Sequence, residues 1–162
     1  MRGAQNLDGI LEQLRDVSET KPEDARMLDP SYYHSAELFE LEKERIFSKE
    51  WICLARIEQV AKPGDFVTVQ LLDEPIVIVR QEDGGVQALS NVCRHRYFPV
   101  AEGQGSTRFF ACPYHKWTYK LDGTLMGAPG MNNSSFDQST CRLPALPTEV
   151  WMGFVFVNLD FN

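Results

Sequence analysis

The chain has 162 residues, of which 43% are hydrophobic and 24% charged, and its formal net charge is −7. This composition is typical of a globular domain, and the acidic balance argues against a nucleic-acid partner, which would need a basic face. No apolar run approaches the roughly 20 residues that span a bilayer, and the first residues lack the apolar core of a signal peptide. We therefore expect neither a membrane nor a nucleic acid as partner.

The N-terminal part of the chain predicts two helices with a polar segment between them. Residues 6–17 carry apolar side chains at helical spacing. The polar residues 18–26 read as a linker. A second helix is expected over residues 36–50, with Ser35 as its N-cap.

From Trp51 onward the apolar pattern changes to period two, which predicts strands. Turn signals rich in Gly, Pro and Asp separate the strands at residues 62–64, 83–85 and 122–123. The expected strands are residues 51–57, 65–72, 75–81, 86–92, 116–120 and 151–160. Many short strands imply a mostly-β fold with peripheral helices, in the form of a small antiparallel barrel or sandwich.

Two short motifs each combine one cysteine with one histidine. Cys93 and His95 form a C-x-H motif, and after sixteen residues Cys112 and His115 form a C-x2-H motif. Two thiolates and two imidazoles suit a [2Fe–2S] centre of the Rieske kind, in which two histidines replace two cysteines on one iron. A structural zinc module is the alternative, although zinc fingers usually pair Cys with Cys and His with His.

The sequence around both motifs resembles a known family. The run CRHRYFPVAEGQGSTRFFACPYHKWTYKLDGTLMGAPG is similar to the Rieske segment of the large (alpha) subunits of Rieske non-haem iron oxygenases, the aromatic-ring-hydroxylating dioxygenase family. The stretches EKERIFSKEW, KPGDFVTV and WMGFVFVNLD extend the similarity over residues 30–160. Respiratory Rieske proteins carry an extra cysteine in each cluster loop. Here Tyr114 stands at one such position and residues 96–100 contain no cysteine, so the oxygenase branch, or its small ferredoxins, matches better.

The resemblance implies a Rieske [2Fe–2S] domain over residues 35–162, with residues 1–34 as an N-terminal helical and linker segment. The two cysteines and two histidines of the motifs would ligate the cluster. The residues expected to surround the cluster are Arg94, Arg96, Tyr97, Phe98, Pro113, Tyr114, Lys116 and Trp117. Among them, Trp117 and Phe98 would form an apolar shell, and the cations would favour the reduced state and a partner of acidic or mixed charge.

Two of these surrounding residues depart from the family pattern. Family members commonly have glycine two residues after the first histidine ligand and directly after the second, where this chain has Tyr97 and Lys116. A side chain at a positive φ angle costs on the order of 1 kcal/mol or more. We therefore expect ordinary backbone conformations at both positions, with both side chains facing outward.

The resemblance also implies a division of labour. In the family a reductase or ferredoxin supplies electrons, which reach a mononuclear iron that activates O2 and is held by two histidines and a carboxylate. This chain has three histidines, so only His34 remains beside the two motif histidines. We expect the Rieske electron-transfer component of an oxygenase, an oxidoreductase of mono- or dioxygenase type, that does not oxygenate substrate alone. The catalytic domain or a neighbouring subunit, in a trimeric full enzyme, would be its partner.

A free-standing electron carrier of the Rieske ferredoxin type is the alternative function. The long N-terminal extension and the WMGFVFVNLD segment favour the oxygenase subunit over it. Cys53 and Cys141 lie far apart in sequence and read as free thiols, which predicts a cytoplasmic location.

Overall fold

The computed structural model describes residues 7–131 and 135–160. The chain divides into two compact units, Met1–Ile46 and Phe47–Asn162. The division therefore follows Ile46, while the start of a Rieske domain at residue 35 stays a prediction. Within the described residues, no helix combines the length and apolar character that crossing a bilayer requires.

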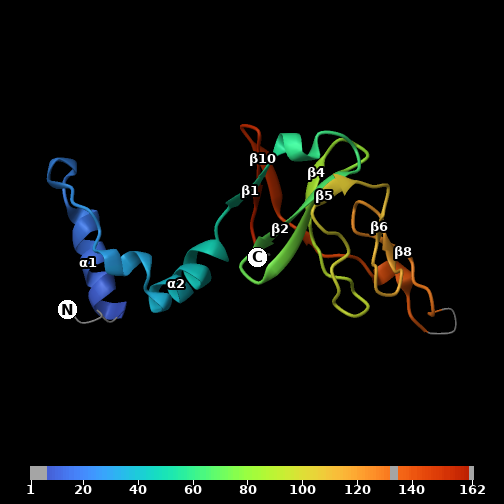
Figure 1. The fold of residues 1–162 in the computed structure, drawn as a ribbon, viewed down its shortest axis with the longest axis horizontal. Helices are drawn as coiled ribbons and strands as arrows, with labels where there is room; N and C mark the ends of the chain where they lie inside the picture. Colours follow the sequence, from blue (N-terminus) through green and yellow to red (C-terminus); the bar gives the residue numbers. More distant parts are fainter. Residues whose placement is uncertain (1–6, 132–134, 161–162) are drawn as a thin grey trace. The chain divides into compact units, whose positions relative to one another are not determined.

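The first unit is helical (Figure 1). Its elements are α1 Leu7–Glu19, the 3-10 turns Pro22–Asp24 and Pro30–Tyr33, and α2 Ala36–Glu42. A π-helical turn, Lys43–Phe47, follows α2 and ends one residue beyond the unit. Ile10, Tyr32 and Leu38 form its small core. The Ser35 hydroxyl accepts a hydrogen bond from the Leu38 amide at 3.2 Å, which confirms the predicted N-cap.

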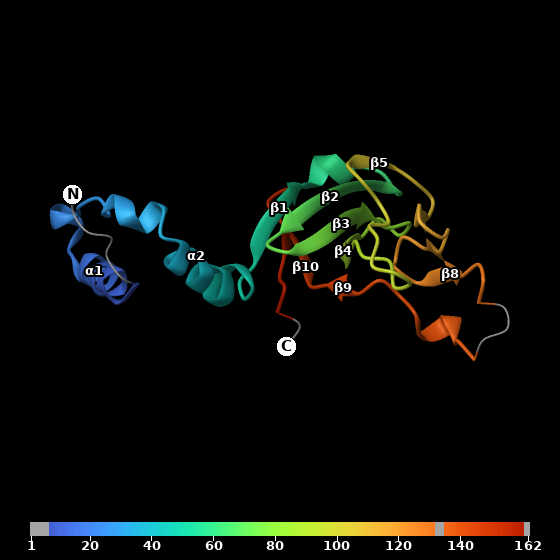
Figure 2. The ribbon, with the colours of Figure 1, turned by 60° about the horizontal axis from the view of Figure 1, so that its bottom comes forward.

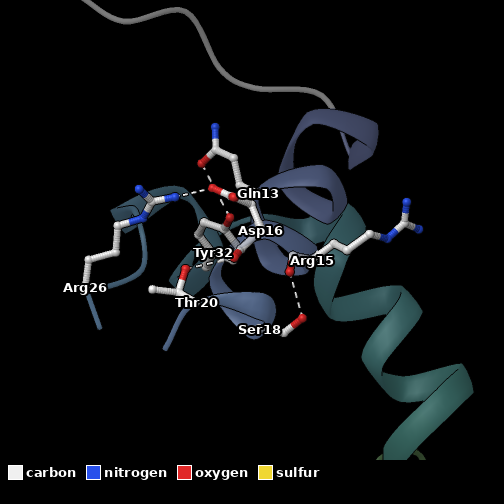
Figure 3. Close-up of polar contacts among 7 residues, drawn as sticks. All are labelled: Gln13, Arg15, Asp16, Ser18, Thr20, Arg26 and Tyr32. Carbon is white, nitrogen blue, oxygen red and sulfur yellow. Dashed lines mark hydrogen bonds and ion pairs between the residues drawn. The ribbon is translucent and has the colours of Figure 1, made fainter. Parts of the chain in front are cut away.

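The polar segment between the two helices folds back onto α1 (Figure 3). Arg26 forms an ion pair with Asp16, and the Thr20 hydroxyl donates to the Asp16 carbonyl at 2.9 Å. Further along, the Tyr32 hydroxyl donates to Gln13 Oε1 at 3.4 Å. Residues 18–26, expected as a linker, are thus partly tied to the helix that precedes them.

The described residues of the second unit form three antiparallel sheets. The strand orders are β1-β11-β10, β5-β2-β3-β4-β9 and β6-β7-β8. The strands are β1 Ile52–Arg56, β2 Asp65–Leu71, β3 Glu74–Arg80, β4 Val86–Ser90, β5 Gln104–Ser106, β6 Phe110–Ala111, β7 Thr118–Tyr119, β8 Leu125–Gly127, β9 Ala145–Leu146, β10 Thr148–Trp151 and β11 Phe154–Val157, with 3-10 turns Ile57–Val60 and Gln138–Thr140. The predicted mostly-β antiparallel fold is confirmed, and the sheets of the described residues do not close into a barrel.

The five-stranded sheet separates two hydrophobic cores. Its strands β2, β3 and β4 lie side by side (Figure 2). Because side chains alternate across a strand, Val77 and Val79 of β3 face one core, and Ile76 and Ile78 face the other. The first core contains both motif cysteines, and the second packs against the β1-β11-β10 sheet. One face of the five-stranded sheet therefore packs in the same core as the cysteines of both motifs.

One predicted strand is instead a hairpin. Residues 151–160 were expected to form a single strand, but Trp151 ends β10 and Phe154 begins β11. Met152 and Gly153 form the two-residue loop, with φ angles of 49° and 82°. Positive φ at both central residues is the geometry of a type I′ turn, whose twist matches that of the flanking strands.

Candidate metal centre

The two motifs lie on loops with the same backbone design. In the first loop (residues 93–98), the Cys93 carbonyl accepts from the Tyr97 amide at 2.9 Å, and the Cys93 amide donates to the Phe98 carbonyl at 2.9 Å. In the second loop (residues 112–117), the bonds recur at the same offsets. The Cys112 carbonyl accepts from the Lys116 amide at 3.0 Å, and the Cys112 amide donates to the Trp117 carbonyl at 2.9 Å.

The residue four positions after each cysteine has a left-handed backbone. The φ angle is 54° at Tyr97 and 60° at Lys116, so the expectation of ordinary backbone conformations was wrong. These are the two positions at which the resemblance implies glycine. Each residue donates the bond that closes its loop, and the left-handed turn there brings the next carbonyl back to the cysteine amide. The outward orientation is confirmed, since Tyr97 is 76% exposed and Lys116 is also exposed.

The two thiols are buried together between the loops. Cys93 and Cys112 are each 1% exposed and interact with one another through their side chains. Burial raises the pKa of the Cys112 thiol, and the neighbouring Cys93 adds to this rise. The backbone N–H groups of Tyr114 and His115, directed at the Cys112 sulfur, oppose it. These amides would stabilise a thiolate once a cation is bound.

The two imidazoles also form a pair. The ring centroids of His95 and His115 are 4.7 Å apart, at an interplanar angle of 70°. Their Nδ1 atoms are both buried, and no described residue forms a hydrogen bond with either. Buried polar atoms normally have a partner, so the two Nδ1 atoms are available as ligands for a bound group. Burial, together with His115 and Arg96, lowers the pKa of His95, which favours the neutral ring that a metal requires.

This donor set fits a binuclear iron–sulfur group. Across residues 7–131 and 135–160, no three His, Cys, Asp or Glu side chains are placed to hold a single metal ion. A Rieske centre needs only two protein ligands on each iron, two cysteines on one and two histidines on the other. The observed pairing of thiol with thiol and imidazole with imidazole matches this requirement.

Aromatic side chains of the second loop cover both imidazoles. The Trp117 ring stacks on His95, with a centroid distance of 4.8 Å and an interplanar angle of 6°. The Tyr114 ring lies 3.8 Å from that of His115 and 5.7 Å from that of Phe98. Trp117 is 3% exposed, so it lies inside, whereas Phe98 is 45% exposed and lies at the surface. The predicted apolar shell is therefore internal at Trp117 and superficial at Phe98.

The cations near the motifs are all exposed. The two loops carry three exposed cations, Arg94, Arg96 and Lys116, which make the surface there positive. Pro113, between Cys112 and Tyr114, is exposed as well. These positions agree with a role at the surface around the site.

The sequence did not indicate two residues beside the motifs, Asn91 and Tyr119. Asn91 is a buried polar residue two positions before Cys93. The Tyr119 hydroxyl lies 3.3 Å from Cys93 Sγ and accepts a hydrogen bond from the Arg94 amide at 3.0 Å. Because its oxygen already accepts, its own O–H is free to donate to the sulfur. Burial and the adjacent Cys93 raise the pKa of Tyr119, which keeps the phenol protonated. Nothing in the motif spacing marks Tyr119, because β7 brings it to Cys93 only in the folded chain.

The comparisons with known proteins agree with this geometry. A family model described as the Rieske [2Fe-2S] domain matches residues 50–148. The chain is 39% identical over 154 residues to a carnitine monooxygenase oxygenase subunit from Acinetobacter pittii, covering 94% of this chain and 42% of that protein. It is 32% identical over 148 residues to a benzene 1,2-dioxygenase subunit alpha from Pseudomonas putida, covering 86% and 32%. A solved quaternary ammonium Rieske monooxygenase, described for carnitine oxidation and inter-subunit electron transfer, matches with TM-score 0.76 and 42% identity over 81% of this chain and 36% of that one.

The chain thus spans about two fifths or less of the relatives that it matches. The matched part is the Rieske portion of oxygenase subunits, and the Rieske domain holds a [2Fe–2S] cluster. The buried thiol pair and the pair of available Nδ1 atoms meet the requirements of that cofactor. The chain belongs to the Rieske [2Fe-2S] domain family.

Proposed function

We propose that this chain carries single electrons for an oxygenase. It would accept them from a reductase or ferredoxin and deliver them to a mononuclear iron in another domain or in a neighbouring subunit of a trimer. The relatives named above are oxygenase subunits, and inter-subunit electron transfer is described for one of them. The histidine count supports an iron held by other residues, because only His34 remains for a site that needs two histidines.

The proposal assigns Cys93 and Cys112 to one iron, and the Nδ1 atoms of His95 and His115 to the other. The observation that carries it is the pair of unpartnered buried Nδ1 atoms on the same two loops as the two buried thiols. When bound, the cluster would take up one electron and release it again.

The chain's own groups would favour the more negative, reduced state. The amides of Tyr114 and His115 point at one cysteine sulfur, and the Tyr119 hydroxyl is within reach of the other. Hydrogen bonds to a negatively charged group stabilise that charge, most strongly where water is excluded. The ligand set acts in the same direction. Neutral imidazoles in place of two thiolates make the site less negative, which places the reduction potentials of such centres at roughly −150 to +300 mV.

The surface around the imidazoles would receive the redox partner. Tyr97 and Tyr114 are exposed aromatic side chains of the kind enriched at protein interfaces. The exposed cations Arg94, Arg96 and Lys116 would select a partner with an acidic or mixed-charge face.

Location and substrate also belong to the proposal. Cys53 and Cys141 are free thiols, which supports a cytoplasmic location. Of the two relatives above, the carnitine monooxygenase subunit is the more similar, so a quaternary ammonium compound is the first substrate to test in a complete enzyme system.

The test is the composition and redox behaviour of the purified chain. Expressed with adequate iron, it should contain about two irons and about two acid-labile sulfides, and show a rhombic EPR signal when reduced. A reductase with NADH, or a ferredoxin supplied in its reduced form, should reduce it by about one electron per chain. Tightly bound zinc with no visible absorption would contradict the proposal. The chain alone, given the same reductase and candidate substrates, should form no oxygenated product.

A further inference from the structure

The two motif loops have unequal stems. Below the second loop, strands β6 and β7 pair in register, with Phe110 opposite Tyr119 and Ala111 opposite Thr118. Below the first loop, the described backbone pairs at an isolated bridge between Val92 and Pro99. Of the two hydrogen bonds that flank this bridge, the one nearer the sheet is long: the Val100 amide donates to the Asn91 carbonyl at 3.3 Å. This bridge does not continue into a ladder, because the Asn91 amide donates to the Pro75 carbonyl and not to the returning chain. At this point the backbone holds the returning chain by a single long hydrogen bond.

The side chain of Asn91 adds three hydrogen bonds to this backbone bond. Its Oδ1 accepts from the Val100 amide at 3.1 Å and from the Ala101 amide at 3.0 Å. Its Nδ2 donates to the Ala101 carbonyl at 2.9 Å. On its other side, the Asn91 amide donates to the Pro75 carbonyl at 2.7 Å, which fixes the residue to the start of β3.

Asn91 is 4% exposed and lies two positions before Cys93. An amide side chain is suited to this task because it accepts and donates in one plane, as a neighbouring strand does. The first loop therefore leaves the central sheet at Asn91 and is fastened back to the same residue after Pro99. Three side-chain hydrogen bonds of ordinary length therefore hold the base of this loop against the sheet.

We propose that Asn91 is a positioning residue of the cluster site: it holds the first loop so that His95 stays against His115 and Trp117. This inference rests on the proposed cluster-binding role of both loops. The stacking of Trp117 on His95 crosses from one loop to the other, so a displaced first loop would change the orientation of the His95 ring. Asn91 itself touches no ligand atom, and it acts through the loop.

The test compares Asn91→Ala with a matched control in the cluster-loaded chain. Thr148 of β10 makes a similar set of bonds outside the two loops: its hydroxyl oxygen accepts from the Ala88 amide of β4 at 2.9 Å, and its O–H donates to the Leu146 carbonyl at 2.7 Å. Thr148→Val therefore removes a comparable strand-to-strand link. Losing two or three hydrogen bonds should lower the free energy of unfolding in both variants.

Only Asn91→Ala should change the cluster. We expect iron release to a chelator to become about tenfold faster, in line with the loss of buried hydrogen bonds, and the EPR g values of the reduced chain to shift. Iron release and g values that match those of Thr148→Val would overturn the proposal.

Amide exchange in the cluster-free wild-type chain supplies a measurement that needs no stable variant. The Ala101 amide should exchange slowly, because Asn91 Oδ1 is its acceptor. Rapid exchange of this amide in the folded chain would overturn the positioning role. Failure of the wild-type chain to bind a cluster would instead overturn the proposed function, so the two failures are distinguishable.

Discussion

The two motif loops have the same pattern of backbone hydrogen bonds, but their side chains have different roles. The residue five positions after the cysteine is Phe98 in the first loop and Trp117 in the second, and both give their carbonyl to the cysteine amide. Yet Phe98 is 45% exposed, whereas Trp117 is buried against His95. The repeated hydrogen bonds thus set the path of each backbone loop. The side chain at the fifth position after the cysteine then either covers an imidazole, as Trp117 does, or forms part of the outer surface, as Phe98 does.

The largest expected effect, loss of the cluster, should be the same for a cysteine substitution in either loop. Cys93→Ser and Cys112→Ser should each abolish cluster binding, because a hard hydroxyl oxygen is a poor substitute for a soft thiolate. Iron content and visible absorption measure the loss. Cys53→Ser and Cys141→Ser serve as controls and should keep a full cluster, since they lie outside both loops. A full iron content in either motif variant would show that the loops are not equivalent in holding the metal.

The next prediction separates the loops. Trp117→Ala should lower the free energy of unfolding by about 3–5 kcal/mol, the usual range for truncating a buried large aromatic residue. Phe98→Ala, at the same loop position, should cost about 1 kcal/mol or less, because much of its ring stays in water. Urea unfolding of the cluster-free chain measures both values. Equal losses would contradict the division into an inner and an outer loop residue.

A third prediction concerns the left-handed residues. Lys116→Gly and Tyr97→Gly should each leave the chain equally stable or up to about 1 kcal/mol more stable, because glycine adopts positive φ freely while adding flexibility to the unfolded chain. Lys116→Gly should also lower the reduction potential, since it removes a cation beside His115. Tyr97→Gly should mainly slow electron transfer to the partner.

Lys116→Gln is the control for Lys116→Gly, because it removes the charge but keeps a side chain at positive φ. It should lower the potential without the gain in stability. An unchanged potential in both Lys116 variants, measured by protein-film voltammetry at low salt, would show that this charge does not act on the cluster.

The comparison of loops also shows where the sequence is informative. The cysteine–histidine pairs, most of the strands and the Ser35 cap were predictable, because each depends on a local pattern. The left-handed Tyr97, Lys116 and Met152 were not, since bulky side chains normally avoid positive φ and only the closing hydrogen bonds require it there.

The residues that support the loops were hidden for a different reason. Tyr119 reaches Cys93 across 26 positions of sequence, and Asn91 holds a backbone segment 10 positions away. Such contacts are set by strand pairing, and a single sequence has no periodic signal for them. Buried polar side chains therefore had to be found in the fold.

The smallest prediction concerns the turn behind the second loop. Burial raises the pKa of Asp122, but hydrogen bonds from the Thr124 amide and hydroxyl, with Arg142 and Lys120 nearby, outweigh it and leave the pKa below its ordinary value. Its stabilising contribution is present above the unfolded-state pKa of about 3.9 and is lost as the pH falls through the lower folded-state pKa. Asp122→Asn should therefore reduce the loss of stability between about pH 6 and about pH 3. An equal loss in both chains, measured by urea unfolding, would contradict this.

The central claim, that the two equivalent loops hold one iron through His95 and His115, is tested most directly by pulsed EPR on the reduced chain labelled with 15N-histidine. The account predicts couplings from two histidine nitrogens, unchanged in a His34→Ala variant, because His34 lies in the helical unit. Coupling to fewer than two histidine nitrogens, or the loss of one in His34→Ala, would contradict it.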